Sequence, residues 1–339
     1  MMRLGALLAD TWRAPSGEVA VDARVWPRTL RAQFPGAQLR ESWVGEGAAF
    51  ARYASAGGPL FLKYLPAGWR DARAAGRLER EAAYLRDLAS GCPVPYAPLL
   101  HAARSADRPL AHLLMRDLTD ATTGWGYFTD DAAREEGLRD VVRLLAALHA
   151  HWAGPGRAAL SGEWTWQPEE VLDRNRVARW QDRPGVPDLP AAQRDALLDA
   201  AQALPALLRD VPVWTLVHGD IHAGQVMWSR ADGTPVLIDY GQVHPSLPGE
   251  DLAHLLALRL DAGERARLGG ELREIYADAL AQAGLPLSPA ALRAQERAGL
   301  ALNLLSTARQ TLRRRGSGSG GVAEALARAA QAWSNDTAT

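Results

Sequence analysis

The chain contains a single lysine, Lys63, although lysine and arginine together number 38. Lys63 stands in the middle of residues 59–65, an apolar run whose length and composition predict a β-strand. An unpaired charge inside a protein is costly, so a lysine is seldom buried in a strand unless a carboxylate neutralises it. The run therefore predicts either an exposed edge strand or a buried ion pair that needs an acidic partner.

The segment after this strand offers such a partner. Residues 71–89 predict a helix, because apolar residues recur there at helical spacing. Glu81 lies beside the apolar stripe, and a carboxylate on a packing face implies a buried cation, for which Lys63 is the obvious candidate. A surface pair with Arg77 is the alternative. The residues of the stripe are Leu78, Ala82, Leu85 and Leu88.

A second informative segment, residues 217–243, contains two short apolar runs joined by a turn. The dipeptide Asp232-Gly233 in that turn is a strong hairpin signal. Asp220 follows the first run, and Asp239 ends the second. Two carboxylates held in this way suit phosphoryl transfer, in which one accepts a proton from the attacking hydroxyl and the other holds a divalent metal on phosphate.

Segment 217–241 resembles the catalytic segment of the aminoglycoside phosphotransferase and choline kinase group, which are small-molecule kinases with a protein-kinase-like fold. The kinase pattern His-x-Asp-x-x-x-x-Asn fits His218 and Asp220, whereas position 225 holds glutamine instead of asparagine. Asp239 begins the counterpart of the Asp-Phe-Gly element. The resemblance implies an α+β, bilobal protein-kinase-like fold, with an antiparallel β-sheet N-lobe and a mainly helical C-lobe.

The same resemblance implies roles for the residues of this segment. Asp220 would be the catalytic base, and Asp239 the principal Mg²⁺ ligand, with Gln225 as a second metal contact. His218 would hold the loop in place, and Asp251 would brace it from the following helix. The alternative for Asp251 is an acid that the helix dipole favours at a helix N-terminus. ATP, or alternatively GTP, would be the phosphoryl donor.

On the nucleotide side, the resemblance implies that Lys63 reaches the phosphates and that Glu81 holds the lysine. The other expected nucleotide contacts are Gly45, Gly47, Met115 and Asp117. The two glycines lie in a predicted hairpin turn between residues 38–44 and 48–54, and the other two residues lie where the lobes would join. The full glycine-rich motif is absent, so an ordinary hairpin turn explains the same glycines.

Composition and periodicity set the expected organisation. With 339 residues and 47% hydrophobic content, the chain can form two subdomains with sizeable cores. We expect an N-terminal extension at residues 1–36 packed on the N-lobe, the N-lobe at 37–117 and the C-lobe at 118–339. The other expected elements are strands at 99–103 and 110–115, a polar linker at 119–131, a buried helix at 138–148, a helix ending before residue 212, and helices beginning near residues 251, 271, 289 and 321.

The expected partner is a small molecule with a hydroxyl acceptor. A net charge of −1 gives no general attraction to nucleic acid or to an anionic membrane, and no apolar run approaches 18 residues. The single cysteine, Cys92, fits a reducing compartment, so we expect a cytoplasmic protein, either monomer or dimer. The short stretch from Asp239 to Asp251 leaves little room for docking a peptide substrate.

Two groups of residues bear on the charge of the acceptor. Acidic residues near the start of the 138–148 helix would attract a cation, and tryptophans in the same region offer aromatic faces. A solvated helix start and core tryptophans explain the same residues. The acids are Asp130, Asp131, Glu135 and Glu136, and the tryptophans are Trp125, Trp152, Trp164, Trp166 and Trp180.

Two other functions fit parts of the pattern. Gln225 and the incomplete glycine motif are compatible with a nucleotide-binding pseudokinase that has little or no turnover. The spacing of His218, Asp220 and His222 is also that of metal ligands, which would fit a metal-dependent hydrolase. Such a hydrolase would recruit further ligands from His244, Asp251 and His254, but it would not explain Lys63 or Glu81.

Overall fold

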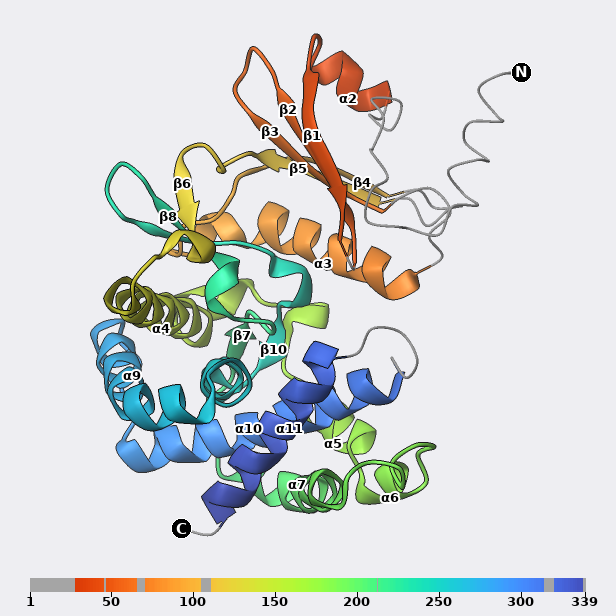
Figure 1. Ribbon diagram of the computed structural model, residues 1–339, viewed down its shortest axis with the longest axis vertical. Helices are drawn as coiled ribbons and strands as arrows, with labels where there is room; N and C mark the ends of the chain where they lie inside the picture. Colours follow the sequence, from red (N-terminus) through yellow and green to blue (C-terminus); the bar gives the residue numbers. More distant parts are fainter. Residues whose placement is uncertain are drawn as a thin grey trace. The chain divides into compact units, whose positions relative to one another are not determined.

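We describe the fold from a computed structural model of the chain, shown in Figure 1. The structure describes residues 28–45, 47–65, 71–104, 111–211, 213–313 and 320–337. It contains two compact units. The sheet unit comprises the described residues up to 91, with 95–124 and 227–242, and the helical unit comprises the remaining described residues. Most of the expected N-terminal extension, residues 1–27, lies outside the described residues.

The sheet unit contains a five-stranded antiparallel sheet with the strand order β1-β2-β3-β5-β4. Lys63 lies on β3, opposite Phe50 of β2 and Leu113 of β5. Because β3 has a partner on each side, the edge-strand interpretation of Lys63 is wrong. The strands are β1 Gln38–Val44, β2 Ala49–Ala54, β3 Leu60–Tyr64, β4 Leu99–Arg104 and β5 Ala111–Arg116.

The two faces of this sheet are covered differently. Alternate residues of β2, β3 and β5 form one apolar cluster with Leu30, which lies on the short helix α2, Arg28–Gln33. The other face carries Lys63, and α3, Ala72–Asp87, packs against β4 and β5 (Figure 1). The alternation of side chains along a strand therefore directs Lys63 away from the α2 cluster.

A smaller sheet in the same unit has the order β6-β8-β9. The hairpin expected from Asp232-Gly233 connects β8 and β9, and Gly233 has a φ of 74°, a left-handed conformation that glycine adopts without strain. The three strands are β6 Thr122–Gly124, β8 Val226–Ser229 and β9 Pro235–Leu237. The expected linker at 119–131 is wrong in part, because residues 122–124 form β6 and pair with β8 instead of remaining irregular.

The helical unit contains a two-stranded sheet and most of the helices. Strands β7, Thr215–Val217, and β10, His244–Ser246, pair with each other in antiparallel register. The helices are α4 Asp131–Ala153, α5 Pro168–Arg174, α6 Val177–Gln181, α7 Ala191–Arg209, α8 Pro248–Ala253, α9 Ala262–Gln282, α10 Pro289–Arg313 and α11 Gly320–Thr337. None of the helices among the described residues is long and apolar enough to cross a membrane.

Two helices begin earlier than their apolar periodicity predicted, because side chains cap them. The Asp130 carboxylate accepts from the backbone N–H of Ala133, which starts α4 at Asp131. Asp261 and Glu264 form a reciprocal capping box, which starts α9 well before residue 271. Polar capping residues lie outside the apolar pattern, so the pattern alone placed both starts too late.

Helices α8 and α10 cross at a glycine on each. A methyl group on Gly249 would lie 1.9 Å from the carbonyl oxygen of Gln295, and one on Gly299 would lie 2.2 Å from that of Gly249. No larger side chain fits at either position without moving a helix. The close crossing fixes α8, and α8 carries Asp251.

The start of α3 allows a test of stability. The Asp71 carboxylate caps α3 by accepting from the backbone N–H groups of Arg73 and Ala74. We predict that Asp71→Ala lowers the free energy of unfolding by about 1 kcal/mol, measured by urea denaturation. The control Asp87→Ala removes an exposed acid at the other end of the helix and should cost less than about 0.5 kcal/mol. Equal losses in the two variants would contradict the cap.

Candidate active site

Lys63 is held between two carboxylates in the sheet unit. Its Nζ donates to Glu81 Oε2 and to Asp239 Oδ1, each at 2.7 Å. Lys63 is 8% exposed and Glu81 only 1%, so the ion pair expected between them is present and buried. Burial alone would lower the pKa of the lysine, but the charges of Glu81 and Asp239 outweigh it and raise the pKa. Lys63 therefore stays protonated, and the alternative pairing of Glu81 with Arg77 is wrong.

Asp239 occupies a strained backbone position. Its φ of 61° is the only positive φ of a non-glycine residue in the part of the chain that the structure describes. Aspartate tolerates this left-handed region better than most residues, but the conformation still persists only where its surroundings enforce it. The adjacent Tyr240 ring stacks on Tyr84 of α3 with centroids 4.4 Å apart, which anchors the turn. The conformation directs the Asp239 carboxylate to Lys63.

Arg77 is a basic residue of this region for which the sequence pattern indicated no functional role. A methyl group on Gly47 would lie 2.6 Å from Arg77 Nη2, so the guanidinium lies directly against the β1–β2 turn. A methyl group on Gly241 would lie 3.5 Å from Arg77 Cβ. Arg77 thus stands between the glycine turn and the residues after Asp239, and no ion pair neutralises it among the described residues. Only its position four residues before Glu81, one helical turn away, could have signalled this.

The face of the sheet that carries Lys63 also carries aromatic rings. Phe50 and Phe61 lie 5.8 Å apart by their centroids, and Trp43 stacks on Phe50 at 5.3 Å. Trp43 is 39% exposed, so the cluster is open to solvent on one side. Its flat apolar surfaces suit stacking on a planar ring.

Met115 and Asp117, the two expected nucleotide contacts near the end of β5, differ in their surroundings. Met115 is buried within the strand. The Asp117 carboxylate is occupied, because it accepts from Arg52 Nε at 2.6 Å and from both the backbone N–H and the hydroxyl of Thr119. The Asp117 backbone N–H donates to Pro59 O. In this conformation neither its side chain nor its N–H is available to a ligand.

In the helical unit, Asp251 organises the loop that follows β7. Its carboxylate accepts from the backbone N–H of His218 at 2.6 Å and from that of Gly219 at 2.9 Å. His149 Nε2 lies 3.1 Å from the same carboxylate, and its Nδ1 lies 2.7 Å from the hydroxyl of Tyr276. A carboxylate only accepts, so His149 donates through Nε2. Asp251 lies in the first turn of α8, but it does more than complement a helix dipole, because it fixes the backbone immediately before Asp220.

Asp251 is completely buried, and this makes its ionisation depend on these donors. Burial alone would raise the pKa of the carboxyl group, but the hydrogen bond from His149 and those from the loop backbone lower it to about 2. The carboxylate therefore stays charged at neutral pH. A buried negative charge that accepts several hydrogen bonds gives the loop one preferred conformation.

Asp220 is held by a chain of side chains that the sequence did not reveal. Arg259 Nη2 donates to Asp220 Oδ1 at 2.7 Å, and Arg259 Nε donates to His254 Nε2 at 3.0 Å. Because that nitrogen accepts, His254 must donate through Nδ1, and it does so to Asn303 Oδ1 at 2.8 Å. Burial and the charge of Arg259 lower the pKa of His254, which agrees with a neutral ring.

His254 and Arg259 are brought together by a π-helical turn, His254–Arg259, which continues α8. In this turn the backbone N–H of Leu260 donates to Leu255 O, five residues earlier, so residues five apart become neighbours. In an ordinary α-helix the two side chains would point in different directions. Single π turns inside α-helices are often found at functional sites.

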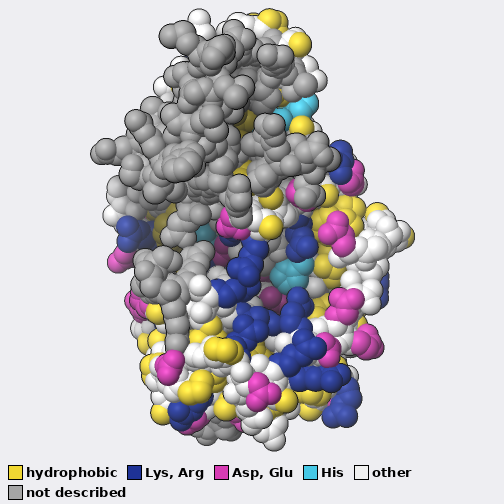
Figure 2. Space-filling model, turned by 90° about the vertical axis from the view of Figure 1, so that its right-hand side faces the viewer, with side chains coloured by type: hydrophobic (Ala, Val, Ile, Leu, Met, Phe, Trp, Pro, Cys, Tyr) yellow, Lys and Arg dark blue, Asp and Glu magenta, His cyan; other side chains and the backbone are white. Residues whose placement is uncertain are grey.

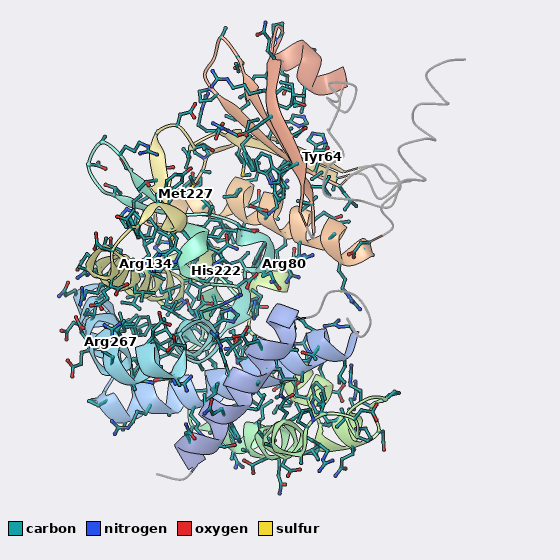
Figure 3. All side chains as sticks on the ribbon, viewed as in Figure 1. Tyr64, Arg80, Arg134, His222, Met227 and Arg267 are labelled. Atoms are coloured by element: carbon teal, nitrogen blue, oxygen red, sulfur yellow. The ribbon has the colours of Figure 1, made fainter. Side chains whose placement is uncertain are left out.

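The ligand cluster required by the alternative metal-dependent hydrolase does not form among the described residues. The His222 ring, labelled in Figure 3, accepts from the backbone N–H of Gly224. Burial, followed by the charge of Arg259, lowers the pKa of His222 to about 4. The described residues contain no group of three or more His, Cys, Asp or Glu side chains placed to hold a metal ion. The hydrolase interpretation therefore lacks its ligand set. Gln225 ends the short turn Ala223–Gln225, directly before β8.

Two of the four acids near the start of α4, Glu135 and Glu136, are neutralised by arginines. Glu135 pairs with Arg267 of α9, which is labelled in Figure 3. Glu136 pairs with Arg139 and Arg143 of its own helix. These acids consequently offer little free charge to a cationic acceptor. The tryptophans are mostly core residues, since Trp152, Trp164 and Trp180 are buried.

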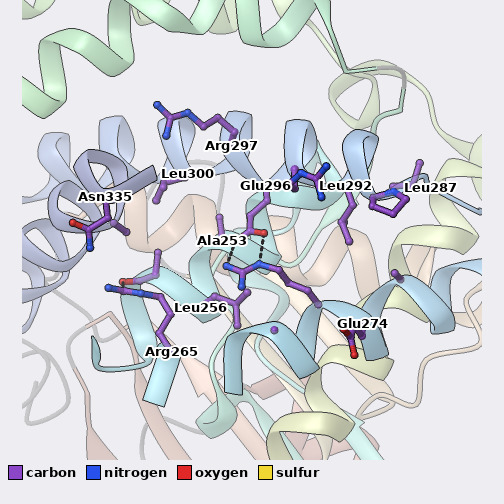
Figure 4. Close-up of a pocket in the computed structure, with 17 residues that line it drawn as sticks. Ala253, Leu256, Arg265, Glu274, Leu287, Leu292, Glu296, Arg297, Leu300 and Asn335 are labelled. Atoms are coloured by element: carbon purple, nitrogen blue, oxygen red, sulfur yellow. Dashed lines mark hydrogen bonds and ion pairs between the residues drawn. The ribbon is translucent and has the colours of Figure 1, made fainter. Parts of the chain in front are cut away.

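A pocket of about 680 Å³ lies elsewhere in the helical unit, between the π-helical turn and helices α9, α10 and α11. Figure 4 shows its lining, including the paired hydrogen bonds from Arg273 to Glu296. None of the residues to which we assign a catalytic role lines this pocket. We therefore do not place the chemistry there.

An antiparallel five-stranded sheet followed by a mainly helical region is the fold of the aminoglycoside phosphotransferases. The family described as "Phosphotransferase enzyme family" matches residues 43–297. Since this covers well over half of the chain, the protein belongs to that phosphotransferase family, and its kinase-like fold is the one expected from segment 217–241. No curated protein matches the chain.

Solved structures with the same fold differ strongly in sequence. A proposed aminoglycoside phosphotransferase from Ralstonia eutropha jmp134 is 17% identical, with a TM-score of 0.66 over 94% of this chain and 98% of its own. A microcompartment-associated aminopropanol kinase is 16% identical, with a TM-score of 0.63 over the same shares. Aminoglycoside phosphotransferase APH(4)-Ia, solved with ADP and hygromycin B, is 17% identical, with a TM-score of 0.62 over 92% of this chain and 98% of its own.

The buried Asp251 leads to a prediction about pH. We predict that Asp251→Asn lowers the free energy of unfolding by about 3 kcal/mol at neutral pH, because an amide group would face backbone N–H donors. The folded-state pKa of Asp251 lies below its unfolded value, so its stabilising effect is full above about pH 4 and is lost as pH falls toward 2. The difference in the free energy of unfolding between wild type and Asp251→Asn should therefore decrease by about 2 kcal/mol between about pH 4 and pH 2.

Chemical denaturation at a series of pH values measures this gap. The control is Asp195→Asn, which changes an exposed acid on α7 and should give no pH-dependent gap. A constant difference between wild type and Asp251→Asn from pH 7 to pH 2 would show that Asp251 is not held ionised by its donors.

Proposed function

We propose that the protein transfers the γ-phosphoryl group of ATP, or of GTP, to a hydroxyl group of a small molecule. The observation that carries this proposal is the single lysine of the chain, which is buried in a central strand between Glu81 and Asp239. A cation held in this way is suited to bind a phosphate group while it remains protonated.

In this proposal, Lys63 binds phosphate oxygens of the nucleotide and Glu81 keeps the ammonium in place. Arg77, which lies against Gly47, adds a second positive charge beside the glycine turn. The exposed ring of Trp43 and the rings beside it are suited to stacking on a purine base. Gly45, Gly47, Met115 and Asp117 remain proposed contacts, with the Asp117 carboxylate limited to a supporting role by its bonds to Arg52 and Thr119.

The donor set around Asp239 suits magnesium. Asp239 offers a half-exposed carboxylate, and Mg²⁺ prefers hard oxygen ligands made up of one or two carboxylates and substrate phosphates. When bound, the ion would neutralise charge on the phosphates. Gln225 is the proposed second contact, and its amide oxygen is the same chemical group as that of asparagine.

Asp220 is the proposed base. The acceptor hydroxyl would donate its proton to the Asp220 carboxylate while its oxygen attacks the γ-phosphorus, and the nucleoside diphosphate would leave with the bridging oxygen. Arg259 restrains Asp220 through Oδ1, and Asp251 fixes the backbone on its N-terminal side. Such restraint matters because most of the catalysis in phosphoryl transfer comes from positioning.

The ligands bound in two solved structures of the same fold support this proposal. The APH(4)-Ia structure contains ADP and hygromycin B, and an aminoglycoside 2'-phosphotransferase-IIIa structure contains GDP. Both a guanine and an adenine nucleotide thus occur among proteins of this fold, and one of these proteins also binds the small molecule hygromycin B. We therefore propose a small-molecule acceptor and leave both nucleotides as candidates.

A pseudokinase is the second candidate, and Gln225 is the observation that favours it. The glutamine side chain is one methylene longer than the asparagine that the kinase pattern requires. If nucleotide binds without any phosphoryl transfer, Gln225→Asn becomes the decisive variant. If wild type is inactive and Gln225→Asn transfers phosphate, Gln225 is the cause of the inactivity.

The nucleotide and catalytic roles can be separated by two variants. We predict that ATP or GTP with Mg²⁺ raises the melting temperature of wild type and of Asp220→Asn, but not that of Lys63→Met, because only folded protein with an intact phosphate site binds the nucleotide. Asp220→Asn should reduce the rate of transfer to a hydroxyl acceptor by at least about a hundredfold. Absence of any nucleotide-dependent shift in wild type would exclude both the kinase and the pseudokinase.

Arg77 provides a further test on the nucleotide side. We predict that Arg77→Met raises the KM for nucleotide about tenfold, which is the loss of one charge-assisted contact of about 1.4 kcal/mol, while kcat changes little. The matched control Arg73→Met removes an exposed arginine from the first turn of the same helix and should leave KM unchanged. Equal KM values for wild type and Arg77→Met would remove Arg77 from the site.

A further inference from the structure

An arginine to which no role has been assigned lies against a buried tryptophan in the helical unit. Arg309 of α10 places its Cζ 5.4 Å from the ring centroid of Trp180, which belongs to α6. Arg183 places its Cζ 5.0 Å from the same ring. Trp180 is only 1% exposed and belongs to the apolar core of the unit. Two guanidinium groups thus share one aromatic platform.

Two N–H donors at this platform have no acceptor. Arg309 Nη1 and the indole Nε1 of Trp180 are both buried, and neither has a hydrogen-bond partner among the described residues. Leaving one buried donor unsatisfied costs about 1–3 kcal/mol, and more for a charged group. Two such donors belonging to side chains in contact call for an acceptor that the polypeptide does not supply.

The charge around Arg309 is also unbalanced. Burial lowers the pKa of its guanidinium to about 10, and the charges of three further arginines lower it in the same direction. Arg313 lies one turn further along α10 and donates to Arg309 O. The other two arginines that act on Arg309 are Arg174 and Arg183. Such a concentration of like charge is costly unless a negative charge offsets it.

Two acids of this region, Glu250 and Asp173, are engaged with other partners. Glu250, whose charge acts favourably on Arg309, hydrogen-bonds Ser246 and lies 3.4 Å from His244. Asp173, next to Arg174, pairs with Arg176 and Arg179 instead. Among the described residues, Arg174, Arg183 and Arg309 have no ion pair. Figure 2 shows dark-blue basic side chains gathered in a band on one face of the molecule, with acidic side chains mainly along its margin.

We propose that Arg309 and Trp180, together with Arg174, Arg183 and Arg313, form a binding site for an oxyanion, either a carboxylate or a phosphate group. The oxyanion would accept from Arg309 Nη1 and Trp180 Nε1 and would offset the charge of the arginines. Arginine suits this task because its planar fork of donors matches a carboxylate or phosphate geometrically. A lone water molecule could accept from one donor, but it would leave the positive charge uncompensated.

Two sources could supply this oxyanion. It is either an anionic group of the hydroxyl acceptor itself or a separate anion that binds the helical unit. The first source rests on the proposed function, whereas the binding site does not. Neither source is a cationic acceptor. The acids of α4 could attract such an acceptor, but the salt bridges of Glu135 and Glu136 disfavour it.

The binding test uses inorganic phosphate and the full-length protein without nucleotide. The chain has 12 tryptophans, and the indole N–H signal of Trp180 in ¹⁵N-tryptophan-labelled protein can be assigned from its loss in Trp180→Phe. We expect phosphate to shift this signal saturably at constant ionic strength. Arg309→Met should weaken the apparent phosphate affinity at least about tenfold. The control Arg179→Met, which removes an arginine paired with Asp173, should leave the affinity unchanged.

A phosphate titration that leaves the Trp180 signal in place, or moves it equally in wild type and Arg309→Met, would overturn the proposal. Thermal unfolding adds a readout that a structural role would not give. Without anion, Arg309→Met should melt no lower than wild type, because it removes a buried charge and one of the two unsatisfied donor atoms, Arg309 Nη1. A large fall in melting temperature without anion would show instead that Arg309 serves the fold.

Kinetics then distinguish the two sources. Serine and ethanolamine both carry a hydroxyl and an amine, but only serine carries a carboxylate, and glycerate and glycerol form a second matched pair. If the acceptor supplies the oxyanion, Arg309→Met should raise KM for the anionic member of the pair that serves as substrate and leave kcat nearly unchanged. If KM is unchanged while the Trp180 shift is lost, the site binds a separate anion. Failure of phosphoryl transfer with intact phosphate binding would reject the proposed function and retain this site.

Discussion

The buried charge of Lys63 is the constraint on which the sheet unit depends. Lys63 lies in a central strand and is only 8% exposed, so water cannot stabilise its charge fully and the fold must bring carboxylates to it. Glu81 meets this need from the helix that covers the sheet, and Asp239 meets it from a turn 176 residues further along the chain. The second contact requires a left-handed backbone at Asp239, a conformation that aspartate tolerates. One cation therefore determines where a strand, a helix and a distant turn must lie.

The helical unit contains the opposite case, a buried negative charge. It buries a carboxylate, Asp251, which accepts hydrogen bonds from two backbone N–H groups and from His149 instead of pairing with a lysine or an arginine. The α8–α10 crossing at Gly249 and Gly299 holds the helix that carries this carboxylate. Because the acceptor of the loop hydrogen bonds is itself fixed, the loop backbone has little freedom. The loop that bears Asp220 is thereby shaped before any ligand arrives, as catalysis by positioning requires.

Much of this arrangement could be predicted from the sequence because it rests on local patterns. The lone lysine in an apolar run, Glu81 beside a helical stripe and the Asp-Gly turn each carry their signal within a few residues. Arg259 and Arg77 carry no such signal, because the first depends on a π-helical turn and the second on contact with a turn remote in sequence. The starts of α4 and α9 were placed too late, since capping residues fall outside the apolar pattern that was used to find the helices.

The abundance of arginine explains why residue type alone could not reveal the oxyanion site. Nearly every basic residue in this chain is arginine, so an arginine at a given position is no indication of function. Several surface arginines, such as Arg139 and Arg143, are paired with carboxylates and only balance charge. Arg309 differs because a buried guanidinium without a carboxylate raises the energy of the folded protein, and such a residue persists where a ligand compensates for it. In this chain the informative property of a cation is therefore its lack of a counter-ion within the described residues, and Trp180 adds a second unsatisfied donor at the same place.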